Sequence, residues 1–433
     1  MVKGAPEKIL RLCSRYYKED GTVCALGSID NLTDMIDEMA KRSVRVLALA
    51  VADEYDEKRL PDNLILVGLA AIRDDLRIDV KASVSEVKRA GIQVVMITGD
   101  KKETAVAIAK EAGIIDSARD IVLTSDDLKN MSDDEIREIL PAVRVVARSL
   151  PTDKSRLVRI AQEIGLVVGM TGDGVNDLPA LKRADVGFAM GSGTDVAREA
   201  GDIVILDDNF SSIKRAVLYG RTIYNSIKKF ITFQLTINVA AVSVSLIGPM
   251  LGVQKPLNIT QMLWINLVMD TLAAIAFGGE AALGKYMLER PKKRDEEILD
   301  KNMWSAIIVN GIFICAMSAL MFVSEDIHCA FRSHSDDLYF YTGYFSFFIF
   351  ACVFNAFNAR TDGIDLLENI SLNKPFLVII ALICVIQIAM TYFGGRILRT
   401  AGLMPSEWVA AIIPALLIIP VDIFRKIIIN SRK

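Results

Sequence analysis

The sequence predicts an α/β domain built on a doubly wound parallel sheet, followed by an all-α membrane domain of six transmembrane helices. Three observations lead to this prediction. Short apolar runs alternate with helical patterns over roughly the first half of the chain. The hydrophobic content of 52% is high for a soluble chain of 433 residues. Charged residues also become sparse in long stretches beyond residue 230, so that part of the chain is predicted to lie in lipid.

The α/β part shows the rhythm of strand, helix and strand that produces a parallel sheet. Strands are predicted at 64–72, 92–98, 143–148, 166–170, 185–190 and 202–206, and helices near 78–90, 102–112, 153–164 and 178–183. Ligands of such sheets bind beyond the carboxyl ends of the strands. The functional residues of this half are therefore expected in the turns that follow its strands.

The membrane part contains six apolar stretches close to the ~20 residues that a membrane-spanning helix needs. They lie at about 230–250, 258–278, 304–323, 339–357, 375–394 and 408–428. Basic residues precede the first stretch, fill the second connection and follow the last stretch, which predicts that these ends face the cytoplasm. The partners expected from this composition are a lipid bilayer and no nucleic acid, because the sequence has no basic arm or patch.

Two polar turns follow predicted strands. The first is Thr98-Gly99-Asp100, and the second runs from Thr171 to Asp177 with the sequence TGDGVND. Glycines let backbone N–H groups approach an anion closely, and carboxylate oxygens suit Mg²⁺ that is also bound to phosphate and water. The two turns therefore predict a site for phosphate and magnesium, although glycine and aspartate also make ordinary turns.

Three longer segments make the pattern more specific. They are RSLPTDKSRLV (148–158), MTGDGVNDLPALKRADVGFAMG (170–191) and ILDDNFSSI (205–213), in this order and followed by the apolar stretches. Together they resemble the P-type ATPases. KGAPE (3–7) and SVRVLALA (43–50) look like the end of the nucleotide-binding domain of that family.

The resemblance implies three domains. Residues 1–63 would be the C-terminal part of a nucleotide-binding domain, 64–214 the C-terminal part of a haloacid-dehalogenase-like phosphorylation domain, and 215–433 the transmembrane domain. It also implies that ATP and Mg²⁺ take part in the reaction.

Residue roles follow from the resemblance, position by position. Nucleotide contacts fall to Lys3, Arg45 and Arg77, the last in a D-D-L-R element (74–77) that lacks the two prolines of the family. Phosphoryl binding falls to Thr98, Gly99, Asp100 and Lys154, and Asp173 would bind Mg²⁺. Asn176 and Asp177 would complete the hydrogen bonds around metal and phosphate.

The phospho-accepting D-K-T-G-T motif of the family does not occur in the sequence. The resemblance therefore implies that the chain corresponds to the C-terminal half of a pump, whose N-terminal half would supply the acceptor aspartate. Alone, the chain is expected to be inactive. Two alternatives are a membrane-anchored haloacid-dehalogenase-type phosphatase and a catalytically dead truncated pump.

A carboxylate within the second apolar stretch indicates what a pump would carry. Asp270 would cost about 3 kcal/mol in mid-bilayer without a partner, and Asn266 lies one helical turn before it. Asn238 offers another oxygen from the preceding stretch. Oxygen ligands favour a hard cation such as Ca²⁺.

The stretch QMLWINLVMDTLA resembles the plasma-membrane branch of the calcium pumps. Ala241, Met269 and Cys352 stand where two-site pumps of the family have oxygen ligands, so the resemblance implies one Ca²⁺ per cycle at the plasma membrane. Asn355 and Asn358 are expected to pack between helices, with a place along a pathway as the alternative. Asp422 is expected to pair with Arg425 while the charges reach toward the interface.

Overall fold

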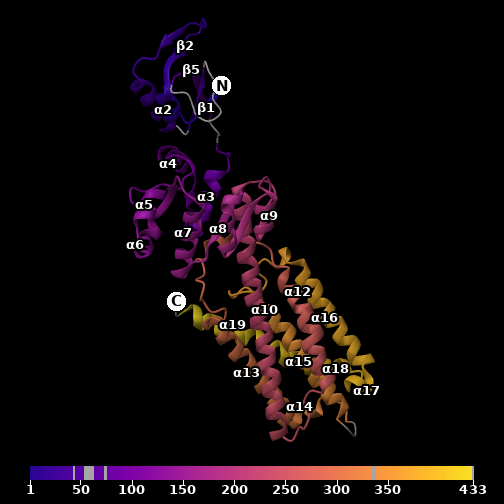
Figure 1. The fold of residues 1–433 in the computed structure, drawn as a ribbon. Helices are drawn as coiled ribbons and strands as arrows, with labels where there is room; N and C mark the ends of the chain where they lie inside the picture. Colours follow the sequence, from indigo (N-terminus) through magenta and orange to yellow (C-terminus); the bar gives the residue numbers. More distant parts are fainter. Residues whose placement is uncertain (42–43, 53–62, 73–75, 334–336, 432–433) are drawn as a thin grey trace. The chain divides into compact units, whose positions relative to one another are not determined.

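A computed structural model describes residues 1–41, 44–52, 63–72, 76–333 and 337–431. Two compact units result (Figure 1). Unit 1 comprises Met1–Val217 and Met287–Glu296, and unit 2 comprises Leu218–Tyr286 and Glu297–Lys433. The helix α10 (Phe210–Met250) contributes residues to both.

The N-terminal part of unit 1 is a five-stranded sheet with the order β1-β4-β5-β2-β3. Its elements are β1 (Val2–Gly4), α1 (Pro6–Ile9), β2 (Cys13–Tyr17), β3 (Val23–Ala25), α2 (Asp30–Lys41), β4 (Arg45–Val51) and β5 (Leu64–Ile72). Most pairs are antiparallel, and only β2 and β5 run parallel. Ile9, Ala48 and Leu64 belong to the core of this sheet.

The strand predicted at 64–72 forms, but its expected place in the parallel sheet is wrong. Residues 64–72 pair with β4 and β2 of the first sheet. A continuous apolar run such as LILVGLAAI predicts a buried strand. It does not indicate which sheet the strand joins, because the same apolar run would suit a buried position in either sheet.

The predicted parallel strands, together with a strand at 121–124 that the sequence analysis did not predict, form two three-stranded sheets among the described residues, with the orders β6-β8-β7 and β11-β10-β9. The strands are β6 (Met96–Ile97), β7 (Ile121–Thr124), β8 (Val143–Ala147), β9 (Gly169–Gly172), β10 (Val186–Met190) and β11 (Ile203–Ile205). The helices between them are α3 (Val80–Arg89), α4 (Lys102–Glu111), α5 (Ser125–Asn130), α6 (Asp133–Ile139), α7 (Pro151–Glu163), α8 (Leu178–Arg183) and α9 (Asp195–Ala200). The parallel strands expected from the sequence are thus present, but one continuous doubly wound sheet is not seen in the described part of the chain.

Unit 2 is entirely helical (Figure 1). Its helices after α10 are α11 (Ile259–Leu263), α12 (Asp270–Gly278), α13 (Lys301–Val323), α14 (Glu325–Cys329), α15 (Leu338–Arg360), α16 (Lys374–Phe393), α17 (Gly395–Leu398), α18 (Pro405–Leu416) and α19 (Ile418–Asn430). In the most apolar 18-residue stretch of α15, 83% is buried inside the protein, whereas the corresponding stretches of the other long apolar helices are 28–39% buried. Helix α15 therefore forms the centre of the unit.

Five helical segments in the described residues are long and apolar enough to cross a membrane: α10, residues 259–278, α13, α15 and α16. The sixth predicted stretch, 408–428, is not one continuous helix. It forms α18 and α19, which meet at Leu417 three residues after Pro414. Proline removes a helical hydrogen bond and clashes with the preceding turn, a property that an apolar count does not register.

Candidate functional site

The first candidate site lies at the carboxyl ends of β6, β8 and β9. The Thr98 backbone N–H donates to the carbonyl of Val146 in β8, and the Ser149 N–H donates to the Thr98 carbonyl. The Thr98 hydroxyl bonds to the Asp100 carboxylate at 3.0 Å. The 98–100 turn is therefore held against the residues that lead directly into α7, the helix that carries Lys154.

Lys154 connects this edge to the second turn. Its Nζ lies 2.5 Å from Oδ1 of Asp177, and both side chains are largely buried, with exposures of 16% and 8%. The other oxygen of Asp177 accepts weak hydrogen bonds from the backbone N–H groups of Asp173 and Gly174. Both oxygens of the Asp177 carboxylate thus have partners within the protein, and these contacts stabilise the conformation of the turn.

Asp173 and Asn176 are exposed on the same turn. The Asp173 carboxylate has no hydrogen-bond or ion-pair partner among the described residues, whereas its carbonyl accepts from the Thr194 N–H at 2.8 Å. A free carboxylate on a rigid turn fits a Mg²⁺ ion that keeps water and phosphate as its other ligands. Within the described part of the chain, no cluster of three or more His, Cys, Asp or Glu residues could hold a metal by itself.

Gly172 is required by the close approach of Asp177. A Cβ atom at Gly172 would lie 2.4 Å from the Cβ of Asp177, whereas a Cβ at Gly99, the middle residue of the first T-G-D turn, would meet nothing within 4 Å. The two glycines thus occupy equivalent places in similar triplets but differ in their surroundings.

This difference gives a prediction for the intact chain in detergent. Gly172→Ala should destabilise the turn by about 1–3 kcal/mol because Asp177 must move, while Gly99→Ala should change stability by less than about 0.5 kcal/mol. Hydrogen exchange of the amides in β9 and α8 measures the effect, and it should accelerate only in the first variant. Equal exchange in both variants would mean that Asp177 does not pack on Gly172.

The structure describes the residues predicted to contact the nucleotide less fully than those of the phosphate site. Lys3 is exposed on β1, and Arg45 pairs through its backbone with Ile72, while the Arg45 side chain lies outside the described part of the structure. Of the D-D-L-R element, Asp74 and Asp75 also lie outside the described residues. Exposed Arg77 donates to the Asp207 carbonyl at 3.0 Å.

The segment after Arg77 is held to the start of α10. Asn209 Nδ2 donates to the Asp79 carboxylate at 2.9 Å, and this hydrogen bond, with a smaller contribution from Ser211, lowers the pKa of Asp79 below its ordinary value. Arg77 and Asp79 therefore fasten the chain before α3 to the residues that lead into α10. No contact of Arg77 with the phosphate-site turns is seen among the described residues.

The second candidate site is in unit 2. Asp270 is 4% exposed at the first residue of α12, and neither carboxylate oxygen has a hydrogen-bond partner among the described residues. The side chain of Gln234, in α10, lies near the Asp270 carboxylate. Two unpaired buried carboxylate oxygens are costly, and they suit a cation that would bind there.

Asn266 and Asp270 differ in burial. Residues Trp264–Met269 form a π-helical turn, in which Asn266 is exposed while Asp270, the residue after the turn, is buried. Their binding of one ion together stays a prediction. Asn238 is half-buried on α10. The sequence reasoning missed Gln234, whose only signal is its polarity on an apolar helix.

Family comparisons agree with the geometry of both units. Residues 5–185 match the family of haloacid dehalogenase-like hydrolases, and 167–217 match a second family of the same description. Residues 254–428 match the family described as cation transporting ATPase, C-terminus. The fold and the two sites thus define a hydrolase-like domain joined to the membrane region of a cation-transporting ATPase.

Individual relatives make the class more specific. The chain is 38% identical to calcium-transporting ATPase 12, plasma membrane-type, of Arabidopsis thaliana, over 98% of this chain and 42% of the relative. It is 36% identical to calcium-transporting ATPase PAT1 of Dictyostelium discoideum, over 99% and 42%, and 33% identical to calcium-transporting ATPase 2 of Schizosaccharomyces pombe, over 100% and 35%.

The chain is homologous, over nearly its whole length, to the C-terminal portion of P-type calcium-transporting ATPases, and it resembles their plasma-membrane branch. It spans about two fifths of the length of these relatives. Its apolar helices make it a membrane protein with several spans.

Proposed function

We propose that the chain supplies the phosphate-binding edge and the ion-carrying helices of an ATP-driven pump that exports Ca²⁺ from the cytoplasm through an aspartyl-phosphate cycle. One observation carries the proposal: a buried carboxylate without a partner, Asp270, lies in an apolar helical unit of the same chain as the Lys154–Asp177 edge. The names of the relatives support Ca²⁺ as the ion and the plasma membrane as the location.

At the phosphate edge, each residue has a distinct task. Lys154 would neutralise phosphate oxygens as a point charge, and Asp177 holds its ammonium group in place between turns. Thr98, Gly99 and Asp100 would hold the transferring group at the end of β6. Mg²⁺, when bound at Asp173, would neutralise charge on the phosphoryl group, with Asn176 as a neighbouring hydrogen-bond donor.

At the nucleotide side, Lys3, Arg45 and Arg77 are proposed to contact ATP. Lys3 is exposed and free to reach an anion, and Arg45 lies on the neighbouring strand of the same sheet. For Arg77, the hydrogen bond to the Asp207 carbonyl favours a second task, which is to fasten the segment before α3.

In the membrane unit, Asp270 would be the charged ligand of one transported Ca²⁺, with Asn238 as a further oxygen ligand. Gln234 joins this proposal because it faces Asp270 from α10. Asn266 is proposed as a further amide ligand, and its exposed side chain would have to turn toward Asp270 to bind the ion. A neutral Ala241 and Met269 leave no second carboxylate for a second ion.

ATP-dependent uptake of ⁴⁵Ca²⁺ tests the proposal. Residues 1–433 replace the matching segment of the Arabidopsis thaliana relative, and the chimaeric protein is assayed in inside-out vesicles. We expect uptake that requires both ATP and Mg²⁺. Hydrolysis of phosphate esters without uptake, in a folded chimaera, would instead favour a membrane-anchored phosphatase.

A further inference from the structure

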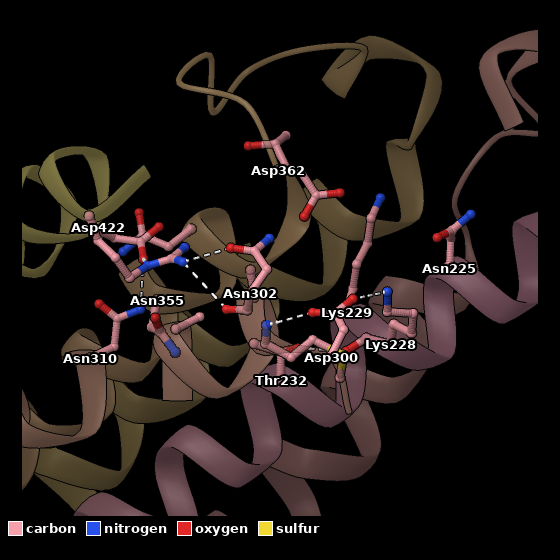
Figure 2. A pocket seen from close by; sticks show the side chains of 16 residues that line it. Asn225, Lys228, Lys229, Thr232, Asp300, Asn302, Asn310, Asn355, Asp362 and Asp422 are labelled. Atoms are coloured by element: carbon pink, nitrogen blue, oxygen red, sulfur yellow. Dashed lines mark hydrogen bonds and ion pairs between the residues drawn. The ribbon is translucent and has the colours of Figure 1, made fainter. Parts of the chain in front are cut away.

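A polar cavity of about 50 Å³ lies in unit 2 between α10, α13, α15 and α19 (Figure 2). Its lining differs from the apolar interior around it, because it includes Asn310 from α13, Asn355 and Asn358 from α15, and Asp422 from α19. None of these residues belongs to the Asp270 site. The cavity therefore calls for a separate explanation.

Two asparagines present acceptor oxygens to this cavity. Asn310 Nδ2 donates to Asp422 Oδ1 at 3.0 Å, and Asn358 Nδ2 donates to the Ile418 carbonyl at 3.1 Å. These bonds fix which way each amide points. Their Oδ1 atoms are buried and have no hydrogen-bond partner among the described residues. The missing partner of both must be a hydrogen-bond donor or a cation.

The side chain of Asn355 favours a hydrogen-bonding ligand over a cation. It is 1% exposed, and both its Nδ2 and its Oδ1 lack a partner in the described structure. A metal cation would satisfy the oxygen and leave the N–H groups without an acceptor. A ligand that both donates and accepts satisfies the whole amide, and water is the smallest such ligand.

The charges around the cavity also disfavour a cation. Asp422 pairs with Arg425 at 2.6 Å and with Lys426 at 3.1 Å, so its negative charge is already compensated. The other charged groups that line the cavity balance one another; they are Lys228, Lys229, Asp300 and Asp362. The side chains of Asp422, Arg425 and Lys426 are all buried. The predicted pairing of Asp422 with Arg425 is confirmed, and because the pair is buried, the cluster needs polar solvation inside the unit.

One ion pair that lines the cavity is partly exposed to solvent. Lys228 Nζ lies 2.5 Å from Asp300 Oδ2, and 45% of the Asp300 side chain is exposed (Figure 2). Both residues and Asn302 also line a second cavity of about 210 Å³. The two cavities thus share a wall at the basic end of the unit, the end that is expected to face the cytoplasm.

We propose that these cavities form a hydrated chamber that admits solvent water between α10, α13, α15 and α19 as far as Asn310 and Asn355. The inner cavity has room for about three to four water molecules. These waters bridge the unpaired amide groups and solvate the Asp422 cluster, so the interface of α10 with its neighbours is wet at this end. The proposal does not depend on Ca²⁺ transport.

Hydroxyl-radical footprinting of the wild-type chain in lipid nanodiscs tests the chamber without a substitution. Met303 lines the cavity and is 5% exposed, and Met321, on the same helix, is 0% exposed in the apolar core. Met303 should oxidise on the order of tenfold faster than Met321, equally in KCl, NaCl and choline chloride. Equal slow rates, or suppression by K⁺ or Na⁺ alone, would overturn the proposal.

A thiol probe examines the deeper end. In a chain with its native cysteines replaced, Asn355→Cys should react with a small water-soluble methanethiosulfonate. Ser346→Cys is the matched control, because Ser346 is 0% exposed on the same helix and does not line the cavity. If both thiols are equally unreactive in variants that elute like the parent chain, solvent does not reach Asn355 and the chamber is dry.

Discussion

Asp270→Ala should abolish equilibrium binding of ⁴⁵Ca²⁺ to the chimaeric pump, a loss of on the order of 100-fold or more in affinity. The reason is that removal of one charge from a buried pair costs about 3–5 kcal/mol. Asp270 is the buried carboxylate whose two oxygens lack partners in the described structure. A filter-binding titration of purified protein measures the effect.

Two neighbouring polar residues provide controls for this result. Gln234→Ala should weaken binding measurably, because Gln234 faces Asp270. Asn266→Ala should have the smaller effect if the π turn persists when the ion binds, because Asn266 is exposed. Binding that survives the loss of Asp270 would place the ion site elsewhere.

Asp173→Asn should slow phosphorylation of the chimaera by ATP about 1000-fold while Ca²⁺ binding stays unchanged. The substitution removes a charged Mg²⁺ ligand from the turn but keeps its size and its backbone hydrogen bonds. Acid-stable phosphoenzyme formed from labelled ATP is the measurement. Asp195→Asn, at an exposed carboxylate on α9, should leave phosphorylation intact.

Two outcomes would contradict the role of Asp173. Normal phosphorylation in the Asp173 variant would show that the carboxylate does not hold Mg²⁺. Parallel loss of phosphorylation and of Ca²⁺ binding in a folded protein would show that Asp173 is a structural residue of the turn, in which case its exposed side chain would be incidental.

The sequence predicted best what depends on local order. The turns at 98–100 and 171–177 could be placed because parallel strands end at one edge, and the structure connects them through residues 148–149 and the Lys154–Asp177 pair. The sheet that receives residues 64–72 could not be predicted, because strand pairing depends on contacts far along the chain. In the described residues, two sheets stand where one was expected.

In the membrane half, too, features that depend on tertiary packing could not be predicted from the sequence. Apolar length predicted five continuous helical segments correctly, but the last stretch divides near Pro414. Helical periodicity did not predict that Asn266 is exposed while Asp270 is buried. The burial of Asp422 was also missed, because its partner Asn310 lies on another helix and meets it only through packing.

The number of Ca²⁺ ions bound per phosphorylation site tests the central claim most directly. It comes from the wild-type arm of the ⁴⁵Ca²⁺ titration, divided by the maximal phosphoenzyme in the same preparation. Asp270 is the buried carboxylate with both oxygens unpaired among the described residues, and Ala241, Met269 and Cys352 offer no further carboxylate, so we expect a ratio of about one and a Hill coefficient near one. Cooperative binding of about two ions would contradict a single site built on Asp270.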